Sequence, residues 1–260
     1  MNKLYLRVLF FLSLMFIFNL AYANLEIMPS VVNISADPMS ICESKYVVTN
    51  IQDVPVTVTI TKEDWKNSNG NDSSITVDRW LELKYTKIDI GPRGTVEVPF
   101  TVITDKNMKG SVSGMIVFAI DGGMIQISMK QPVYVTIKGT EKVDFKIDSL
   151  KMGMIESGGS EKGGIYYNMT VKNDGNVHIR HNGVIEIYSR KTGNIVKSVD
   201  IEETFPTYAQ ESREFKGIVL KEKELAKGKY TAVFKIKAFD KQVTKSINFK
   251  VSRLGEVVTN

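Results

Sequence analysis

The sequence has 260 residues, of which 34 are Lys or Arg and 29 are Asp or Glu, for a formal net charge of +5. With 43% hydrophobic and 24% charged residues, the composition excludes a disordered chain and a bundle of membrane helices. The single cysteine, Cys42, excludes an intramolecular disulfide, so packing must stabilise the fold.

The first 23 residues have the pattern of a secretory signal peptide. Lys3 and Arg7 precede an apolar run over residues 8–20, and the small residues of 21–23 follow. The run is shorter than the roughly 20 residues that a membrane helix needs. We therefore expect cleavage after Ala23, no stable membrane span afterwards, and a periplasmic or extracellular protein; an uncleaved anchor is the alternative.

The sequence contains few candidate residues for metal binding or catalysis. The only histidines are His178 and His181, in a stretch with a strand pattern, where a spacing of three places them on opposite faces. No zinc site is expected from them. Since no nucleophile, base and orienting group can be named together, we predict no catalytic residues, no cofactor and no enzyme. Export argues against a nucleic-acid partner.

From residue 25 onward, short apolar alternations of period two are separated by Gly, Pro, Asn and Asp, which is typical of an all-β protein. A first domain is predicted over residues 24–140. Its expected strands, in chain order, are residues 25–32 (interrupted by Pro29), 45–50, 55–65, 80–88, 95–103, 113–120 and 125–138, with an exposed loop at 67–74.

The strand over residues 125–138 has the clearest alternation. Its odd positions from Ile125 to Ile137 are apolar except for Gln131, while its even positions are mostly polar. At roughly 3.3 Å per residue, the strand is about twice the usual length. We expect part of it to project or to form an edge, since Pro132 favours an edge or a bulge.

A second domain is predicted over residues 141–260. Its expected strands are residues 143–150, 165–172, 177–180, 184–188, 195–201, 230–237 and 243–251, with a single helical turn at 221–227. About seven strands in each half predict two tandem immunoglobulin-like β-sandwich domains after the signal peptide.

The charges of the two halves differ. Residues 24–140 hold 11 cations and 13 anions, while residues 141–260 hold 21 cations and 16 anions. Part of the excess in the second half comes from a lysine-rich pair of strands with Lys235, Lys237, Lys241, Lys245 and Lys250. These lysines are interpreted either as a patch for an acidic partner or as a solvated face.

The signal peptide, the two sandwiches and the segments of residues 126–130 and 134–138 (QISMK and YVTIK) resemble the periplasmic chaperones of pilus assembly. That resemblance implies that the strand lends its apolar residues to an incomplete pilus subunit by strand addition. The residues so implied are Ile125, Ile127 and Met129, with Lys130 beside them. The family also grips a subunit carboxylate with an Arg in its first strand and a Lys in its last. Here residues 25–32 contain no Arg, and Tyr134 occupies the Lys position.

The chain is also similar to two-domain surface proteins of Gram-positive bacteria. The shared features are Trp80, the turn at residues 91–92, the stretches of residues 110–114 and 171–176, and residues 228–230. Such proteins usually end in a membrane anchor, whereas no anchor precedes Asn260, which favours the soluble periplasmic interpretation.

The sequence therefore predicts an exported, non-enzymatic, chaperone-like protein that holds pilin-like or surface-protein subunits by β-strand addition. Its partner-binding residues would be Ile125, Ile127, Met129 and Lys130. Two alternatives stay open: these apolar side chains face their own core, or the chain is a structural or adhesive cell-surface interaction module.

Overall fold

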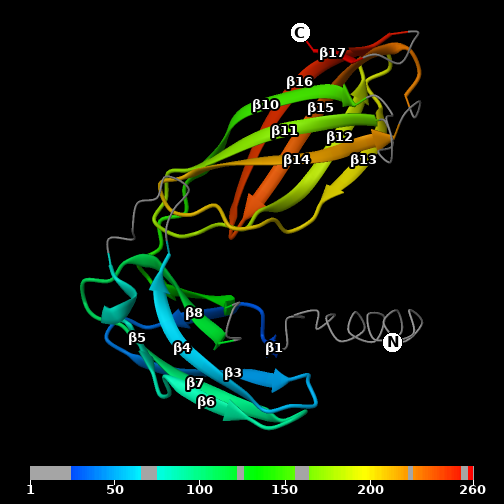
Figure 1. The fold of residues 1–260 in the computed structure, drawn as a ribbon. Helices are drawn as coiled ribbons and strands as arrows, with labels where there is room; N and C mark the ends of the chain where they lie inside the picture. Colours follow the sequence, from blue (N-terminus) through cyan, green and yellow to red (C-terminus); the bar gives the residue numbers. More distant parts are fainter. Residues whose placement is uncertain are drawn as a thin grey trace, which may run out of the picture.

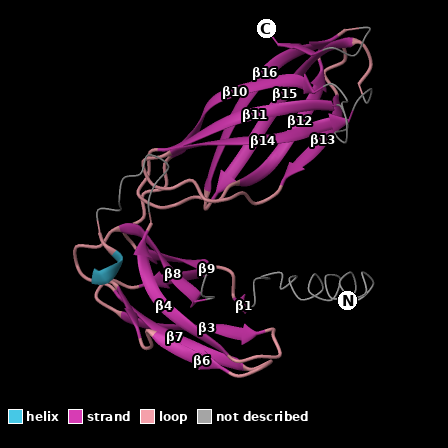
Figure 2. Ribbon diagram, viewed as in Figure 1, coloured by secondary structure: helices cyan, strands magenta, loops and turns pink. Residues whose placement is uncertain are grey.

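The computed structural model describes residues 25–65, 75–121, 126–155, 164–221, 225–252 and 257–259. These residues form strands almost throughout, with one short 3-10 helix, η1 (Val77–Arg79), so the all-β prediction is confirmed (Figure 2). The strands build two β-sandwiches that meet at one end (Figure 1). The predicted signal peptide and Ile125 lie outside the described residues.

The first sandwich consists of two sheets with strand orders β1-β3-β7-β5 and β2-β9-β8-β4-β6. The strands are β1 (Leu25–Met28), β2 (Val32–Ala36), β3 (Ile41–Asn50), β4 (Val56–Asp64), β5 (Leu81–Leu83), β6 (Lys87–Ile90), β7 (Thr95–Ile103), β8 (Gly110–Asp121) and β9 (Gln126–Ile137). Alternate side chains of both sheets point inward and bury one core around Trp80, Tyr46 and Phe118.

The chain changes sheets twice where the sequence predicted single strands. The segment of residues 25–32 divides at Pro29, so β1 pairs with β3 and β2 pairs with β9 in the other sheet. The strand predicted over residues 80–88 is wrong: β5 pairs with β7 and β6 pairs with β4. The buried residue Leu81 has an odd number, whereas the buried residues Ile88 and Ile90 have even numbers. In one regular strand, odd and even residues point to opposite faces, so a single strand could not direct all three to the same core.

The second sandwich has a three-stranded sheet, β10-β11-β14, packed on a five-stranded sheet, β13-β12-β15-β16-β17. The strands are β10 (Phe145–Ile155), β11 (Gly164–Asn173), β12 (Asn182–Ser189), β13 (Ile195–Ile201), β14 (Ser212–Lys221), β15 (Gly228–Ala238), β16 (Lys241–Val251) and β17 (Val257–Thr259). A separate core surrounds Phe234, Ile185 and Met169.

Two expected elements of the second half differ from the structure. Residues 177–180 do not form a strand; they contribute only an isolated bridge between Ile179 and Thr207. Conversely, β14 was not predicted from the sequence. The helical turn expected over residues 221–227 falls partly outside the described residues, and Lys221 is in β14.

Both sandwiches contain the same buried asparagine turn. At the end of β3, the Asn50 amide donates to the carbonyls of Val54 (2.7 Å) and Ile90 (3.3 Å) and accepts from the N–H two residues later. At the end of β11, Asn173 donates to the carbonyls of Val177 (2.7 Å) and Thr207 (3.0 Å) and accepts from the N–H two residues later. The two domains are therefore structural duplicates at this corner.

Candidate functional site

The long strand β9 is paired along its whole length on one side and along only half of its length on the other. On one side, β8 pairs with it in antiparallel register from Gln126 to Ile137. On the other side, β2 pairs with it in parallel register over residues 133–137 only. Within the described chain, the outer edge of residues 126–132 has no neighbouring strand. We call this segment the open edge.

The direction of the backbone groups at the open edge follows from strand alternation, because successive residues direct their N–H and C=O groups to opposite sides. Lys138, directly after β9, donates its N–H to the carbonyl of Ala36 at the end of β2 (2.9 Å). Residues of even number therefore direct their backbone groups away from β8. Pro132 is one of these even-numbered residues, so the lack of an N–H at Pro132 removes no hydrogen bond between β8 and β9. The N–H and C=O groups of Ser128 and Lys130 point to the open edge.

The apolar side chains of the open edge face the inside of the first sandwich. Val133 and Val135 of β9 are fully buried in its core, and Ile127 and Met129 share their parity. Met129 is partly buried against that core, and Ile127 is half-buried opposite Ile120 of β8. These two residues thus line the interior beside the open edge, as the alternative of a core-facing role anticipated.

Lys130 lies on the opposite face of β9. Its Nζ is 2.5 Å from Oε2 of Glu63 on β4, and both side chains are close to half exposed. Tyr134 lies on this same outer face by its parity. The structure therefore divides the predicted partner-binding set: Ile127 and Met129 face inward, Lys130 faces outward, and Ile125 is not described.

The open edge carries less charge than the other long edge strands. Sheet edges of natural proteins are commonly protected by charged side chains and bulges. The outer strand β13 contains Lys197, Asp200 and a bulge near Tyr188, and β14 carries four charged residues in ten. Within residues 126–132, Lys130 is the one charged residue, and Glu63 pairs with it. The open edge is therefore the least protected of these three against an added strand.

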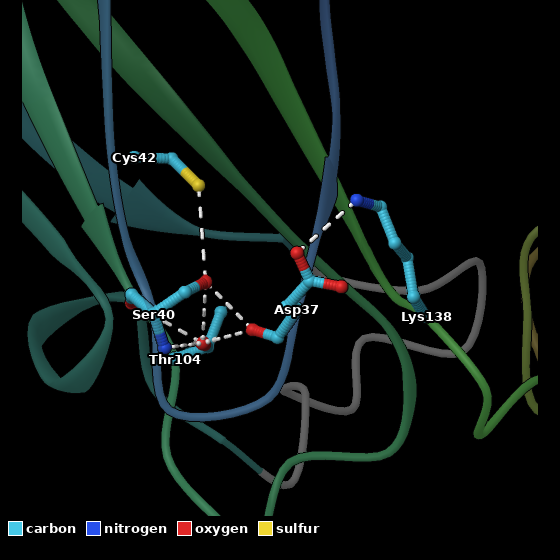
Figure 3. A network of polar contacts seen from close by, with 5 residues as sticks. All are labelled: Asp37, Ser40, Cys42, Thr104 and Lys138. Carbon is cyan, nitrogen blue, oxygen red and sulfur yellow. Dashed lines mark hydrogen bonds and ion pairs between the residues drawn. The ribbon is translucent and has the colours of Figure 1, made fainter.

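A polar network fixes the strand that covers the rest of the β9 edge. The carbonyl of Asp37, directly after β2, accepts hydrogen bonds from the hydroxyls of Ser40 (2.6 Å) and Thr104 (2.8 Å), as Figure 3 shows. The Asp37 carboxylate pairs with Lys138 at 3.3 Å. Cys42 is half-buried, and its Sγ lies 3.9 Å from the Ser40 hydroxyl. These contacts anchor the C-terminal end of β2 beside Ile137, while the open edge ends at the other end of β2, where Val32 pairs with Val133.

Tyr46 contacts the last residue of the open edge from the inside of the sandwich. Its ring is fully buried between Phe100 and Phe118, and its hydroxyl donates to the Pro132 carbonyl at 3.1 Å. Burial, with a smaller contribution from Tyr134, raises the pKa of Tyr46 above its usual value. The hydroxyl therefore stays protonated and donates to the carbonyl of the residue directly before the part of β9 that β2 covers.

The two sandwiches are joined through backbone contacts at the start of β8. The N–H of Ser111 donates to the Asn176 carbonyl, and the N–H of His178 donates to the Ser111 hydroxyl, both at 2.9 Å. Gly110 has a φ of +70°, and a Cβ there would lie 2.0 Å from the Asn176 carbonyl oxygen. The close approach of the domains at this point therefore requires glycine. We call these contacts the junction clamp.

An aromatic cluster extends the junction from β9 to the second domain. The hydroxyls of Tyr134 and Tyr208 are 2.7 Å apart, and the Trp65 ring lies 4.6 Å from the Tyr208 ring. The His178 ring lies 4.7 Å from the Tyr134 ring, with the Arg180 guanidinium 5.5 Å from that ring. No sequence pattern groups these residues, because they come from four separate segments.

Tyr134 links this cluster to the open edge, since both belong to β9. Burial and the hydrogen bond with Tyr134 raise the pKa of Tyr208, so its hydroxyl stays neutral. At the position where the resembled chaperones carry a lysine, this chain has a phenol that is hydrogen-bonded to Tyr208.

Both histidines are uncharged at neutral pH; His181 is fully buried and His178 is partly buried. Burial and the nearby Arg180 lower the pKa of His178 to about 4, and burial lowers that of His181 to about 4. Among the described residues, no group of three or more His, Cys, Asp and Glu side chains is placed to hold a metal ion. Nor does any helix in that part of the chain have the length and apolarity to cross a membrane.

The lysines of the second domain are largely engaged within the protein. Lys235 pairs with Glu186 at 2.7 Å and Lys241 with Asp144 at 2.6 Å. Lys245 donates to the carbonyl of Asp148 at 2.6 Å. These internal bonds favour the interpretation of a solvated face over a patch for an acidic partner.

The sequence matches no family model and no curated protein. Solved structures similar to the chain include the Pseudomonas aeruginosa CupB2 chaperone, at 8% identity over 90% of this chain and 97% of that chain, with a TM-score of 0.44. A chaperone–tip adhesin complex of CFA/I fimbriae is 14% identical over 86% of this chain and 98% of that chain, with a TM-score of 0.46. The E. coli chaperone DraB is 12% identical over 85% and 95%, with a TM-score of 0.42. The similarity concerns the arrangement of strands.

Proposed function

We propose that this chain is an exported, non-enzymatic, chaperone-like protein that holds pilin-like or surface-protein subunits by β-strand addition at the open edge. One observation carries the proposal: β2 covers only residues 133–137 of β9, so among the described residues no strand pairs with the preceding backbone groups of Ser128 and Lys130, which an added strand can use. The direction of these backbone groups supports binding of a partner strand through main-chain hydrogen bonds, with the neighbouring side chains selecting its sequence.

The residues inside the edge define the chemistry of the partner strand. Because Ile127 and Met129 face the sandwich interior, an added strand would direct every second side chain toward them. Those side chains should be apolar, and the intervening ones, which face solvent and the Lys130–Glu63 pair, should be polar. A subunit strand with alternating apolar residues meets this requirement.

Site-specific photo-crosslinking tests the proposal. A photoreactive residue at Ser128, on the open edge, is compared with one at Ser198, an exposed serine on the edge strand β13 of the second domain. We expect Ser128 alone to crosslink to a small exported subunit, within a segment of alternating apolar residues. Equal labelling from Ser198, or none from Ser128, would contradict strand addition at this edge.

A charge substitution provides an independent check. Ile127→Asp places a carboxylate where the partner's apolar side chains would pack, and it should abolish capture of that subunit while the circular dichroism spectrum stays unchanged. Ile195→Asp introduces the same charge at an exposed apolar residue of β13 and should leave capture intact. Retained capture by the Ile127 variant would refute the proposal.

A further inference from the structure

The side chain of His178 is enclosed at the junction of the two sandwiches. Its ring lies 4.7 Å from the Tyr134 ring of the first domain, and its backbone N–H bonds to Ser111 of β8. The connection between the domains, residues 138–144, includes Gly139, which has a φ of +76° and open space where a Cβ would lie. His178 is therefore placed where a change at one side chain can alter the contact between domains.

The surroundings of His178 accept its neutral form and oppose its charged form. In the described structure, Nδ1 is buried and has no hydrogen-bond partner. The imidazolium carries an N–H on both ring nitrogens, so its Nδ1–H would have no acceptor among the described residues, and its charge would lie near the Arg180 guanidinium, which already faces the Tyr134 ring. Desolvation and this cation both disfavour the imidazolium.

Several other titratable groups lie around the junction. Tyr134 on β9 and Tyr208 on the β13–β14 connection share a hydrogen bond between their hydroxyls. Arg213 on β14 is a further cation that acts on Tyr208, and Glu211, the neighbouring carboxylate, lies on the connection just before β14. The neighbour whose charge acts on His178 is Arg180.

We propose that His178 is an acid-sensitive latch: in its neutral form it holds the two domains together at the junction clamp, and its protonation favours their separation. This inference concerns the relation of the domains and does not depend on the partner that binds the open edge. Because Tyr134 is on β9, opening of the latch would also release the outer face of the strand that carries this edge.

The effect of pH on domain separation can be calculated from the pKa of His178 in the closed junction and in solvent. The pKa of His178 is about 4 in the closed junction, whereas a solvated imidazole has a pKa of roughly 6.5. Because the open form binds a proton more tightly than the closed form, the ratio of open to closed molecules rises as the pH falls below about 6.5. The total increase is about 300-fold once the pH is well below 4. Above pH 6.5 the latch is fully engaged.

Fluorine NMR of the full chain labelled with 5-fluorotryptophan tests the latch, because the protein has two tryptophans. Trp65 packs on Tyr208 at the junction, and Trp80 is fully buried in the first core. On acidification below pH 6.5, the Trp65 signal should change reversibly while the Trp80 signal does not. The radius of gyration from X-ray scattering should rise over the same range.

His178→Phe preserves an aromatic ring beside Tyr134 but cannot be protonated, so it should abolish the acid response of Trp65. His181→Phe removes the other buried histidine, which lies in the second core, and should retain the response. If His178→Phe does not fold, His178→Gln carries the same expectation. The proposal is overturned if a folded His178 variant follows the wild-type curve, or if Trp65 and Trp80 change together.

Discussion

Two proline substitutions at adjacent positions of β9 distinguish the open edge from the paired side. Ser128 directs its N–H to the open edge, as Pro132 would if it had one, whereas Met129 directs its N–H to β8 opposite Phe118. Ser128→Pro therefore removes a donor that no described residue uses, and Met129→Pro removes a ladder hydrogen bond. Only the second change should weaken the fold, and only the first should leave a folded protein that binds no strand.

The expected difference in stability follows from the interactions that each proline removes. Met129→Pro leaves the Phe118 carbonyl of the buried central strand without its donor, which costs about 1–3 kcal/mol. The ring also removes the Met129 side chain from its partly buried position against the core, which adds about 1 kcal/mol or more. Ser128 is exposed, so its replacement should change the free energy of unfolding by at most about 1 kcal/mol.

Urea unfolding, followed through Trp80 in the first core, measures this difference, and hydrogen exchange tests its premise. In the unmodified protein the amides of Ser128 and Lys130 should exchange rapidly, and those of Ile127 and Met129 slowly. Binding of a subunit should then protect the first pair. Slow exchange at Ser128 and Lys130 in the free protein, or equal destabilisation by the two prolines, would show that the assignment of backbone directions is wrong.

Three further substitutions or conditions test the rest of the structure. Gly110→Ala should separate the domains, detected as a larger radius of gyration, because its Cβ would lie 2.0 Å from the Asn176 carbonyl; Gly139→Ala, with a similar φ and open space, is the matched control and should keep the domains together. Asn173→Ala should destabilise the second domain by about 2–4 kcal/mol in urea unfolding, since two buried carbonyls lose their donor; a loss below about 1 kcal/mol would contradict this role. The folded-state pKa of His181, about 4, lies below its unfolded value, so stability that His181 contributes above pH 6.5 should fall by about 3 kcal/mol as the pH drops to 4; His181→Gln should remove this contribution and leave that of His178.

The sequence predicted most strands because their alternation is regular, and it failed where the alternation changes phase. In β14, Phe215 and Val219 point to the core with Gly217 between them, and a bulge opposite Ile165 and Tyr166 then brings Leu220 inward as well. An interruption of this kind removes the period-two signal, although the strand has ten residues. The same cause divided the strand expected over residues 80–88.

Residues 177–180 show the opposite failure, in which a correct pattern does not make a strand. Val177 and Ile179 are buried in the second core, while His178 and Arg180 point to the first domain. The alternation is therefore real, but the backbone partners are Thr207 and the Ser111 hydroxyl instead of a neighbouring strand. Periodicity reports which side chains are buried and carries no information on what the backbone pairs with.

The candidate site, too, could be predicted only as far as its side-chain pattern, because that pattern does not show which strands pair. The alternation of Ile127 and Met129 predicted a strand with one apolar face, and β9 confirms that strand. Whether its edge is open depends on where another segment, β2, begins to pair with it. Such a contact links residues about 100 positions apart, and the sequence of β9 alone does not encode it.

The open edge exists because the first strand region is shared between two sheets. Residues 25–28 close the edge of β3, and after the turn at Pro29 only five residues remain in β2 to cover the twelve of β9. A chain that stayed beside β9 would complete that sheet but would leave β3 uncovered over Val47–Asn50. One segment cannot satisfy both edges, so the first sandwich keeps one half-covered strand. The Asp37 network anchors the end of β2 that lies beside Ile137, and the Tyr46 hydroxyl bonds to the carbonyl of Pro132, the last residue before the covered part of β9. A strand that is firmly covered over one half and open over the other is what an interface for an added strand requires.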